Sequence, residues 1–385
     1  MAKVLTGSDI LATRGFADMT DKKIGFVGNH TSRLSTGVPT HVEMSRAKHV
    51  ELVKLFSPEH GAFGMEDCEG IADDVDPVTR LPIFSLYGEI RKPTSEMLDG
   101  LDMLVFELQD VGARFYTYAS TMLLCMEAAN DAGIEFVVLD RPNPISLARV
   151  EGPIADAGLL SFTACHAIPI RHGLTMGELA RLAAAERGFG IAPRVVACEG
   201  LTESMWWDDT GLPWTSPSPA MATLDTATVY PGVCLLEQAN VSVGRGTESP
   251  FQLAGAPWID AAGWADAIGR VAGGGIDIRP VEFRPAASKF AHETCHGVEL
   301  IVTDRDALES VRLGIAMIVG LRDIHGGQFD LAGVGTLLAG GQTMRLIETG
   351  CTTGRIVDGW THDLAAWDDR VRPNRLYDRK AGGSA

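Results

Sequence analysis

Features that would place this chain outside the cell or in a membrane are scarce in its 385-residue sequence. The seven cysteines are odd in number, widely spaced and form no C-x-x-C pair, which is typical of reduced thiols. The N-terminal segment lacks the continuous apolar stretch of a signal peptide, and no segment approaches the length of a membrane span. We therefore expect a cytoplasmic protein that is not associated with a membrane.

Positive charge is also in short supply. Lysine and arginine number 33 against 50 aspartates and glutamates, which gives a formal net charge of −17. Such a chain has no general attraction for DNA, RNA or an anionic membrane. Hydrophobic residues make up 45% of the sequence and charged residues 22%, so we expect a globular protein. Its length favours two domains over a single core.

Motifs that bind nucleotide phosphates or carry a serine nucleophile are missing as well. The turn after the first expected strand, at residues 25–31, lacks the G-x-G-x-x-G spacing that lets the backbone approach a pyrophosphate. There is no Walker loop and no G-x-S-x-G nucleophile elbow. A dehydrogenase, an NTPase and an ordinary serine hydrolase are therefore disfavoured, and no cofactor is expected.

One metal-binding pattern is present. His292, Glu293 and His296 match H-E-x-x-H, in which two histidines one helical turn apart bind zinc beside a glutamate base. Gly297 follows at once and a strand is expected next, so no long helix carries the motif and no third ligand stands at a familiar spacing. We expect no metal site here, with a zinc peptidase kept as a lesser alternative.

Apolar runs alternate with helical segments through the first half of the chain. Strands are expected at 23–29, 50–56, 83–87, 103–106 and 136–139, several of them apolar throughout. Helices are expected at 119–129, ended by Gly133, and at 175–187, which opens with the capping-box pair Thr175 and Glu178. This alternation predicts an α/β fold with a doubly wound, mainly parallel sheet.

The composition changes in the middle of the chain. Residues 206–255 are rich in proline, tryptophan, glycine and small polar residues, and long loops of this kind are usually functional or disordered. Beyond them we expect helices at 261–271 and 308–321, a strand at 297–303 and a charged coil near Lys380. The predicted division is a domain at 1–256, which includes the tryptophan- and proline-rich stretch, and a smaller α/β domain at 257–385.

Polar side chains gather directly after the expected strand at 103–106. Gln109, Asp110, Arg114, Tyr116 and Tyr118 crowd this turn, where Gly112 lets the backbone bend. Ligands of open α/β sheets bind beyond the carboxyl ends of the strands, so we interpret this cluster as a binding site. The simpler alternative is a helix cap provided by Asp110 or Thr117.

Further carboxylates, histidines and arginines follow the other expected strands. They are Glu59 with His60, Glu107, Asp140 with Asn143, Arg171 with His172, and Arg245 with Glu248 from the middle stretch. A pair of carboxylates acting as general acid and base, with aromatic and amide groups nearby, is what glycoside cleavage requires.

Sequence segments along most of the chain resemble the DUF1343 family. They are LFSPEHG at 55–61, SLYG at 85–88, QDVGARFYTY at 109–118, LDRPNP at 139–144, PIRHG at 169–173, GLPW at 211–214, YPG at 230–232 and GRGT at 244–247. That family includes exo-β-N-acetylmuramidases, which release N-acetylmuramic acid from the non-reducing ends of peptidoglycan fragments. The resemblance implies a Rossmann-like catalytic domain, a C-terminal ancillary domain and a site in the cleft between them.

On this basis we assign roles to the candidate residues. Glu59 is the expected general acid, because partial burial in a proline-glycine turn would raise its pKa. Asp110, or Tyr116 if the nucleophile is a tyrosine, would act on the opposite face of the sugar. The expected substrate-binding residues are His60 and His172 for hydroxyls, Arg114, Arg171 and Arg245 for the lactyl carboxylate, and Tyr118, Asn143 and Glu248.

A sugar-binding protein that keeps the pocket without the chemistry is the main alternative. Ala220 follows Ser218 and Pro219 where the family often has an asparagine, so one amide that would contact a sugar is replaced. The sequence leaves open whether the anomeric configuration is retained or inverted, and how many subunits assemble.

Overall fold

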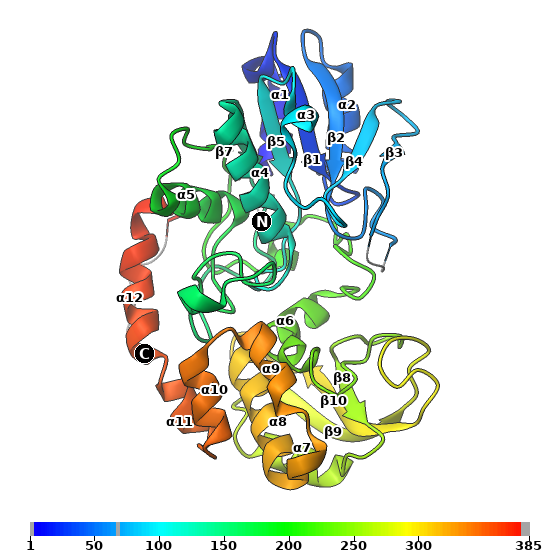
Figure 1. The fold of residues 1–385 in the computed structure, drawn as a ribbon, viewed down its shortest axis with the longest axis vertical. Coiled ribbons are helices and arrows are strands. Elements are labelled where there is room, and N and C mark those ends of the chain that lie inside the picture. Colours follow the sequence, from blue (N-terminus) through cyan, green and yellow to red (C-terminus); the bar gives the residue numbers. More distant parts are fainter. Residues whose placement is uncertain (1–3, 67–69, 379–385) are drawn as a thin grey trace.

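The computed structural model describes residues 4–66 and 70–378, and two sheets organise them (Figure 1). The larger sheet has seven strands in the order β3-β4-β2-β1-β5-β6-β7. Its strands are β1 (Lys23–Gly28), β2 (Glu51–Ser57), β3 (Asp74–Val75), β4 (Pro82–Ser85), β5 (Met103–Glu107), β6 (Glu135–Leu139) and β7 (Arg194–Val196). Neighbouring strands pair in parallel except β3, a short antiparallel edge strand on β4. The predicted mainly parallel α/β sheet is confirmed.

Both faces of this sheet are covered by apolar side chains. Along β5, Met103 and Val105 belong to one buried cluster, whereas Leu104 and Phe106 belong to another on the opposite face. The first cluster includes Leu11 from α1 (Gly7–Thr13) and Met44 from α2 (Thr40–Arg46), while α4 (Tyr118–Ala132) and α5 (Met176–Arg187) contribute to the second. Double covering explains why these strands are continuous apolar runs.

The expected helix boundaries are also found. Thr175 and Glu178 form the predicted capping box at the start of α5, with each side chain accepting from the other residue's backbone N–H at 3.2 Å. Gly133 ends α4 in the left-handed conformation, with φ of 71°. A short helix, α3 (Ser95–Leu98), lies between β4 and β5.

The second sheet is smaller and antiparallel. Its order is β8-β10-β9, formed by β8 (Leu253–Ala256), β9 (Ile276–Phe283) and β10 (Cys295–Val302). The helices of this half are α6 (Leu224–Val233), α7 (Ala261–Gly269), α8 (Ser310–His325), α9 (Leu331–Leu338), α10 (Gly341–Glu348), α11 (Thr353–Asp358) and α12 (Thr361–Val371). Helix α12, red in Figure 1, returns to the first half, where Arg370 Nε lies 2.6 Å from Glu186 of α5.

Some elements were not predicted. Strand β9 lacks a clear alternation because it carries Arg279, Pro280 and Glu282 at an exposed edge. Helices α9 to α12 are short and interrupted by glycines, so their period is weak, and Lys380 itself lies outside the described residues. The boundary at residue 257 stays a prediction. In the structure β8 joins the small sheet, and α6 packs on α8 where Gly232 meets Gly314.

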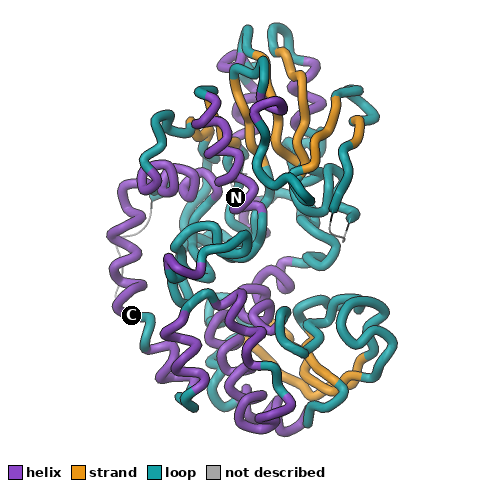
Figure 2. The backbone as a smooth tube through the Cα atoms, viewed as in Figure 1, coloured by secondary structure: helices purple, strands orange, loops and turns teal. Residues whose placement is uncertain are grey.

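Loops fill much of the region between the sheets, as the teal segments of Figure 2 show. They include the turns that follow β2, β4 and β5, at the carboxyl ends of these strands. In the part of the chain that the structure describes, no helix is both long enough and apolar enough to span a membrane.

Candidate active site

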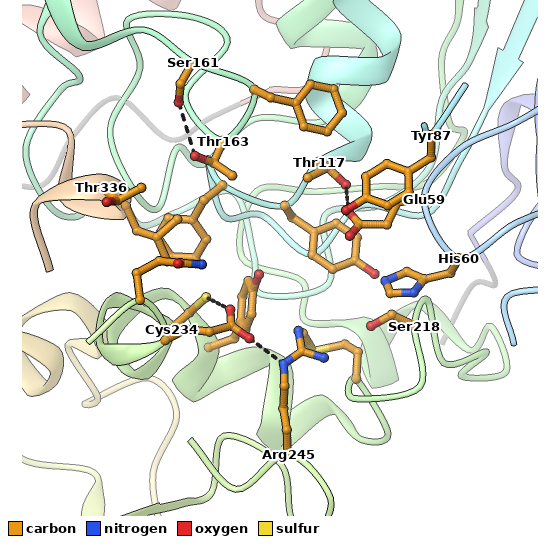
Figure 3. Close-up of a pocket in the computed structure, with 18 of the residues that line it drawn as sticks. Glu59, His60, Tyr87, Thr117, Ser161, Thr163, Ser218, Cys234, Arg245 and Thr336 are labelled. Carbon is orange, nitrogen blue, oxygen red and sulfur yellow. Dashed lines mark hydrogen bonds and ion pairs between the residues drawn. The ribbon is translucent and has the colours of Figure 1, made fainter. Parts of the chain in front are cut away.

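A cavity of about 520 Å³ lies at the carboxyl ends of β2, β4 and β5, between the two halves of the chain (Figure 3). The turns of the larger sheet and the loop after β6 contribute Glu59, His60, Tyr87, Arg91, Phe115, Tyr116, Thr117, Ser161, Phe162 and Thr163. The later part of the chain contributes Ser218, Met221, Tyr230, Cys234, Glu237, Gln238, Arg245, Phe251, Thr336 and Leu337. We call this cavity the pocket.

Glu59 is presented to the pocket by a tight turn after β2. His60 and Gly61 both have positive φ angles, 70° and 72°, which reverse the chain directly after Glu59. The carboxylate is half-buried and accepts a hydrogen bond from the Thr117 hydroxyl (Figure 3). The His60 Nδ1 atom lies 2.7 Å from the Glu66 carbonyl oxygen, and it carries the proton there because a carbonyl only accepts.

Thr117 was considered as a helix cap, and that alternative is wrong. Thr117 precedes α4, but its side chain makes no capping hydrogen bond and donates to Glu59 instead. A residue at the start of a buried helix thus orients the carboxylate of another segment. Sequence alone gives no signal of this contact, since the two residues are 58 positions apart.

Tyr116 lines the pocket with a buried hydroxyl. Burial raises the pKa of this phenol well above its ordinary value, and the neighbouring Asp110 and Glu59 carboxylates act in the same direction. Within the described residues, the hydroxyl has no partner with hydrogen-bonding geometry. Tyr116 is therefore suited to donate a hydrogen bond to a ligand as a neutral phenol, rather than to attack as a tyrosinate.

Glu237 is a pocket carboxylate that the sequence analysis missed. It follows α6, and its side chain pairs with Arg245 and accepts from the Cys234 thiol at 3.1 Å (Figure 3). The Arg245 guanidinium also lies 5.4 Å from the Phe251 ring centroid. Residue 237 falls in the stretch interpreted as a long loop, where no sequence motif marks it. Its pairing with Arg245 in the pocket is seen only in the structure.

Arg114 was expected to hold a substrate carboxylate, but it lies outside the pocket. Its fully buried guanidinium donates to the carbonyl oxygens of Pro153 and Ile168, both at 2.9 Å. It also donates to Leu337 and Leu338 at 2.9 and 2.7 Å, at the C-terminal end of α9. Burial lowers the pKa of Arg114 to about 10, so it stays charged at neutral pH. The structure gives this residue a packing role.

Arg171 is likewise placed in the interior. Its Nη1 atom donates to Glu151 Oε1 at 2.6 Å, and its guanidinium also donates to the Ile145 carbonyl oxygen. The other oxygen of Glu151 accepts from the Val311 backbone N–H at 2.9 Å, in the first turn of α8. Arg171 and Glu151 therefore connect the two halves of the chain and do not line the pocket.

Four other candidates are engaged below or beside the pocket. Asp110 Oδ2 accepts from the Gly112 N–H at 2.6 Å and lies 3.6 Å from His172 Nε2, and both side chains are buried. Asn143 donates to the Leu174 carbonyl at 3.0 Å, and the Tyr118 hydroxyl donates to the Pro217 carbonyl at 2.8 Å. None of the four lines the pocket, because these turns direct them into the protein.

Glu248 is the last candidate outside the pocket. Its side chain is exposed to solvent, in the loop that follows Arg245. Of the predicted site residues, the structure thus brings together Glu59, His60, Tyr116 and Arg245.

Glu107, the last residue of β5, and Asp140, directly after β6, are also buried, and together with Arg114 and Arg171 they make up what we call the buried polar layer. Glu107 Oε1 accepts from Arg141 Nη1 at 2.6 Å and from the Ser8 hydroxyl at 2.8 Å. Asp140 accepts from Thr175 Oγ1, the Gly177 N–H and the Tyr377 hydroxyl at 2.6 to 2.8 Å. Burial raises the pKa of Asp140 to about 6. These groups tie the segments around Ser8 and Tyr377 to the ends of β5 and β6.

The H-E-x-x-H pattern has no helical geometry. His292 and Glu293 are exposed in a loop, where His292 has a φ of 65°, and His296 lies in β10 with Nδ1 3.1 Å from Glu282. Two histidines in these positions do not share the face of one helix. Over residues 4–66 and 70–378, no group of three or more His, Cys, Asp or Glu side chains is arranged to hold a metal ion.

Family models account for nearly the whole chain. The N-terminal model of the exo-β-N-acetylmuramidase NamZ matches residues 24–225, and the C-terminal model matches residues 228–377. The chain belongs to the NamZ family. A curated relative, the peptidoglycan β-N-acetylmuramidase NamZ of Bacillus subtilis (strain 168), is 38% identical over 380 residues, which cover 97% of this chain and 92% of the relative.

Solved structures of DUF1343 proteins share the fold of this NamZ-family chain. One crystal structure from Bacteroides fragilis NCTC 9343 has a TM-score of 0.90 and 30% identity, covering 98% of this chain and all of that one. A second from the same organism has a TM-score of 0.81 and 27% identity, with the same coverage. The resemblance noted in the sequence is confirmed along the full length, so the pocket sits in a shared architecture.

Proposed function

We propose that this chain is an exo-acting β-N-acetylmuramidase that releases N-acetylmuramic acid from the non-reducing ends of peptidoglycan fragments. The family models and the Bacillus subtilis relative carry the name of this activity. The observation that carries the proposal is that one pocket is lined by two carboxylates, Glu59 after β2 and Glu237 after α6. Most glycoside hydrolases use a pair of carboxylates that flank the scissile bond.

Glu59 is the proposed general acid. It is half-buried and faces the pocket, and its Thr117 partner orients the carboxyl group. As the bond between the anomeric carbon and the leaving oxygen breaks, the Glu59 proton passes to that oxygen, and water supplies the hydroxyl group of the released sugar. His60 and Tyr116 lie within the same wall and are proposed to bind sugar hydroxyl or acetamido groups.

Glu237 is proposed for the second catalytic role, in place of Asp110 and Tyr116. Asp110 lies outside the pocket, and Tyr116 is held as a neutral phenol. Glu237 lines the same pocket as Glu59, and Arg245 and Cys234 fix its carboxylate. It would either attack the anomeric carbon or activate a water molecule, and the anomer of the product distinguishes these two routes.

The test is hydrolysis of a disaccharide with N-acetylmuramic acid at its non-reducing end, followed by proton NMR from the first turnovers. We expect release of N-acetylmuramic acid as a single anomer, and no cleavage when the terminal residue is blocked at its 4-hydroxyl. Binding of the disaccharide without any product would support the sugar-binding alternative and contradict the proposed activity.

The setting we propose is the cytoplasm, with a small saccharide as the substrate. The cysteines among the described residues are free, which suits a reducing compartment. In that setting the enzyme would act on saccharides taken up or recycled from the cell wall, and neither a metal nor an organic cofactor is part of the proposed chemistry.

A further inference from the structure

Arg91 enters the pocket supported by two aromatic rings. Its guanidinium carbon lies 4.3 Å from the ring centroid of Phe162 and 5.8 Å from that of Tyr87, and the two ring centroids are 6.3 Å apart. All three residues line the pocket. Stacking uses the faces of the planar guanidinium, which leaves its N–H edge available for hydrogen bonds in the plane.

The ring that supports Arg91 most closely is itself held in place. Phe162 lies in the loop between β6 and α5, and its carbonyl oxygen accepts from the Ser120 hydroxyl of α4. Ser161 and Ala164 pair through backbone hydrogen bonds of 3.2 and 3.1 Å, which close this loop into a turn. Arg91 is therefore supported by a structure that is anchored to the main helical layer.

Among residues 4–66 and 70–378, the charge of Arg91 has no partner. In the part of the chain that the structure describes, its guanidinium forms no ion pair and donates no hydrogen bond. Its neighbour Lys92, by contrast, pairs with Asp131 at 2.8 Å and with Glu127 at 3.8 Å. The other arginine of the pocket, Arg245, is engaged with Glu237.

The pocket carries Glu59 and Glu237, so an anionic ligand would be repelled unless a cation faced its charge. N-acetylmuramic acid differs from N-acetylglucosamine by a lactyl ether that bears a carboxylate. A guanidinium edge binds a carboxylate with two parallel hydrogen bonds. Arg114 and Arg171, the arginines first considered for this task, are bound to groups in the interior.

We infer that Arg91, held against Phe162 and Tyr87, binds the lactyl carboxylate and selects N-acetylmuramic acid over N-acetylglucosamine. The inference rests on the proposed function and names the residue that determines its specificity.

The test compares Arg91→Gln with wild type on three nitrophenyl β-glycosides: that of N-acetylmuramic acid, that of its lactyl amide and that of N-acetylglucosamine. Losing a charge-assisted pair should lower kcat/KM for the first substrate by about 10- to 100-fold, mainly through KM. The amide and the N-acetylglucosamine glycoside lack the carboxylate, so their rates should stay within about two-fold of wild type. Arg91→Lys should restore part of the loss, and Lys92→Gln, the matched control, should change nothing.

Two outcomes would overturn the inference. An equal loss on all three substrates would show that Arg91 shapes the pocket without binding the carboxylate. An unchanged rate on the N-acetylmuramic acid glycoside would show that Arg91 does not contribute to substrate binding. If wild type hydrolyses none of them, the proposed activity fails. Calorimetry with the free sugars then decides the role of Arg91: weaker binding of N-acetylmuramic acid alone to Arg91→Gln supports it, and unchanged binding rejects it.

Discussion

The buried polar layer and the pocket contain the same kinds of charged side chain but use them differently. In the layer, Arg114 donates to four backbone carbonyl oxygens, and Arg171 donates to Glu151 and to one carbonyl oxygen. In the pocket, Arg91 lies against two aromatic rings and forms no ion pair with the described residues, and Glu59 is half-exposed. A charged group near a strand end therefore indicates a site only where the chain also places it against a cavity.

Arg114 shows how the layer joins the two halves of the chain. Its guanidinium carries a charge into the interior, pairs with no carboxylate of the described residues and is stabilised by four carbonyl oxygens. Two of these carbonyls end α9, where the helix dipole favours a cation. The pocket between the halves keeps its shape because such buried contacts fix one wall relative to the other.

The largest effect is expected at Glu59, in the pocket. Glu59→Gln keeps the size of the side chain but cannot deliver a proton, so turnover of the natural disaccharide should fall by about 100- to 10,000-fold. Ligand binding, measured by calorimetry, should stay close to wild type. The loss should be smaller on a nitrophenyl glycoside, because its leaving group needs little protonation.

Glu237→Gln is the matched variant for Glu59→Gln. If Glu237 acts on the anomeric carbon or on water, its loss should slow the natural and the nitrophenyl substrate alike. Full turnover of the disaccharide by Glu59→Gln would remove Glu59 from the acid role and leave Glu237 as the remaining candidate for it among the carboxylates that the described residues place in the pocket.

The next largest effect is expected at Arg114, in the buried layer, and it should be an effect on stability. Arg114→Met removes a donor from four buried carbonyl oxygens. The Ile168 oxygen keeps the Ala155 N–H at 3.2 Å, and each of the other three becomes unsatisfied at a cost of about 1–3 kcal/mol. The free energy of unfolding in urea should fall by at least about 3 kcal/mol. The protein that remains folded should keep the wild-type KM. A raised KM with unchanged stability would return Arg114 to the substrate site.

How far the sequence predicts this protein can be judged from β5 and Arg114. The run at Met103–Glu107 is apolar because both faces are covered, so a local pattern was enough to place the strand and its polar end. The placement of the Arg114 side chain depends on a carbonyl group 223 residues further along the chain, and no local sequence pattern predicts that contact. Glu59, His60, Tyr116 and Arg245 line one cavity, and their catalytic and binding roles stay predictions.

A smaller effect on stability is expected from the titration of Asp140. Burial raises its pKa in the folded protein to about 6, above the ordinary 3.8. Between these values the unfolded chain loses its proton first, so stability is fully present below about pH 4 and is lost as pH rises to about 6. The loss is on the order of 3 kcal/mol at 1.36 kcal/mol per pKa unit. Above pH 6 this contribution is constant.

Asp140→Asn isolates this titration from that of all other groups. From pH 4 to pH 6, the unfolding free energy of wild type should fall relative to that of the variant, as measured by urea titrations at each pH. A shift in the opposite direction would mean that the three donors to Asp140 stabilise its ionised form more than burial opposes it.

The smallest effect is expected at His292, which does not line the pocket. The side chain is exposed in a loop with positive φ, and His296 is paired with Glu282 on the small sheet, so the two histidines lack the helical spacing that zinc needs. His292→Ala should leave kcat/KM unchanged and shift stability by less than about 0.5 kcal/mol. Activity should also survive dialysis against a chelator. The prediction would be contradicted by zinc bound at one equivalent per chain, with activity lost on its removal and restored on its return. The H-E-x-x-H motif beside the small sheet would then take part in catalysis.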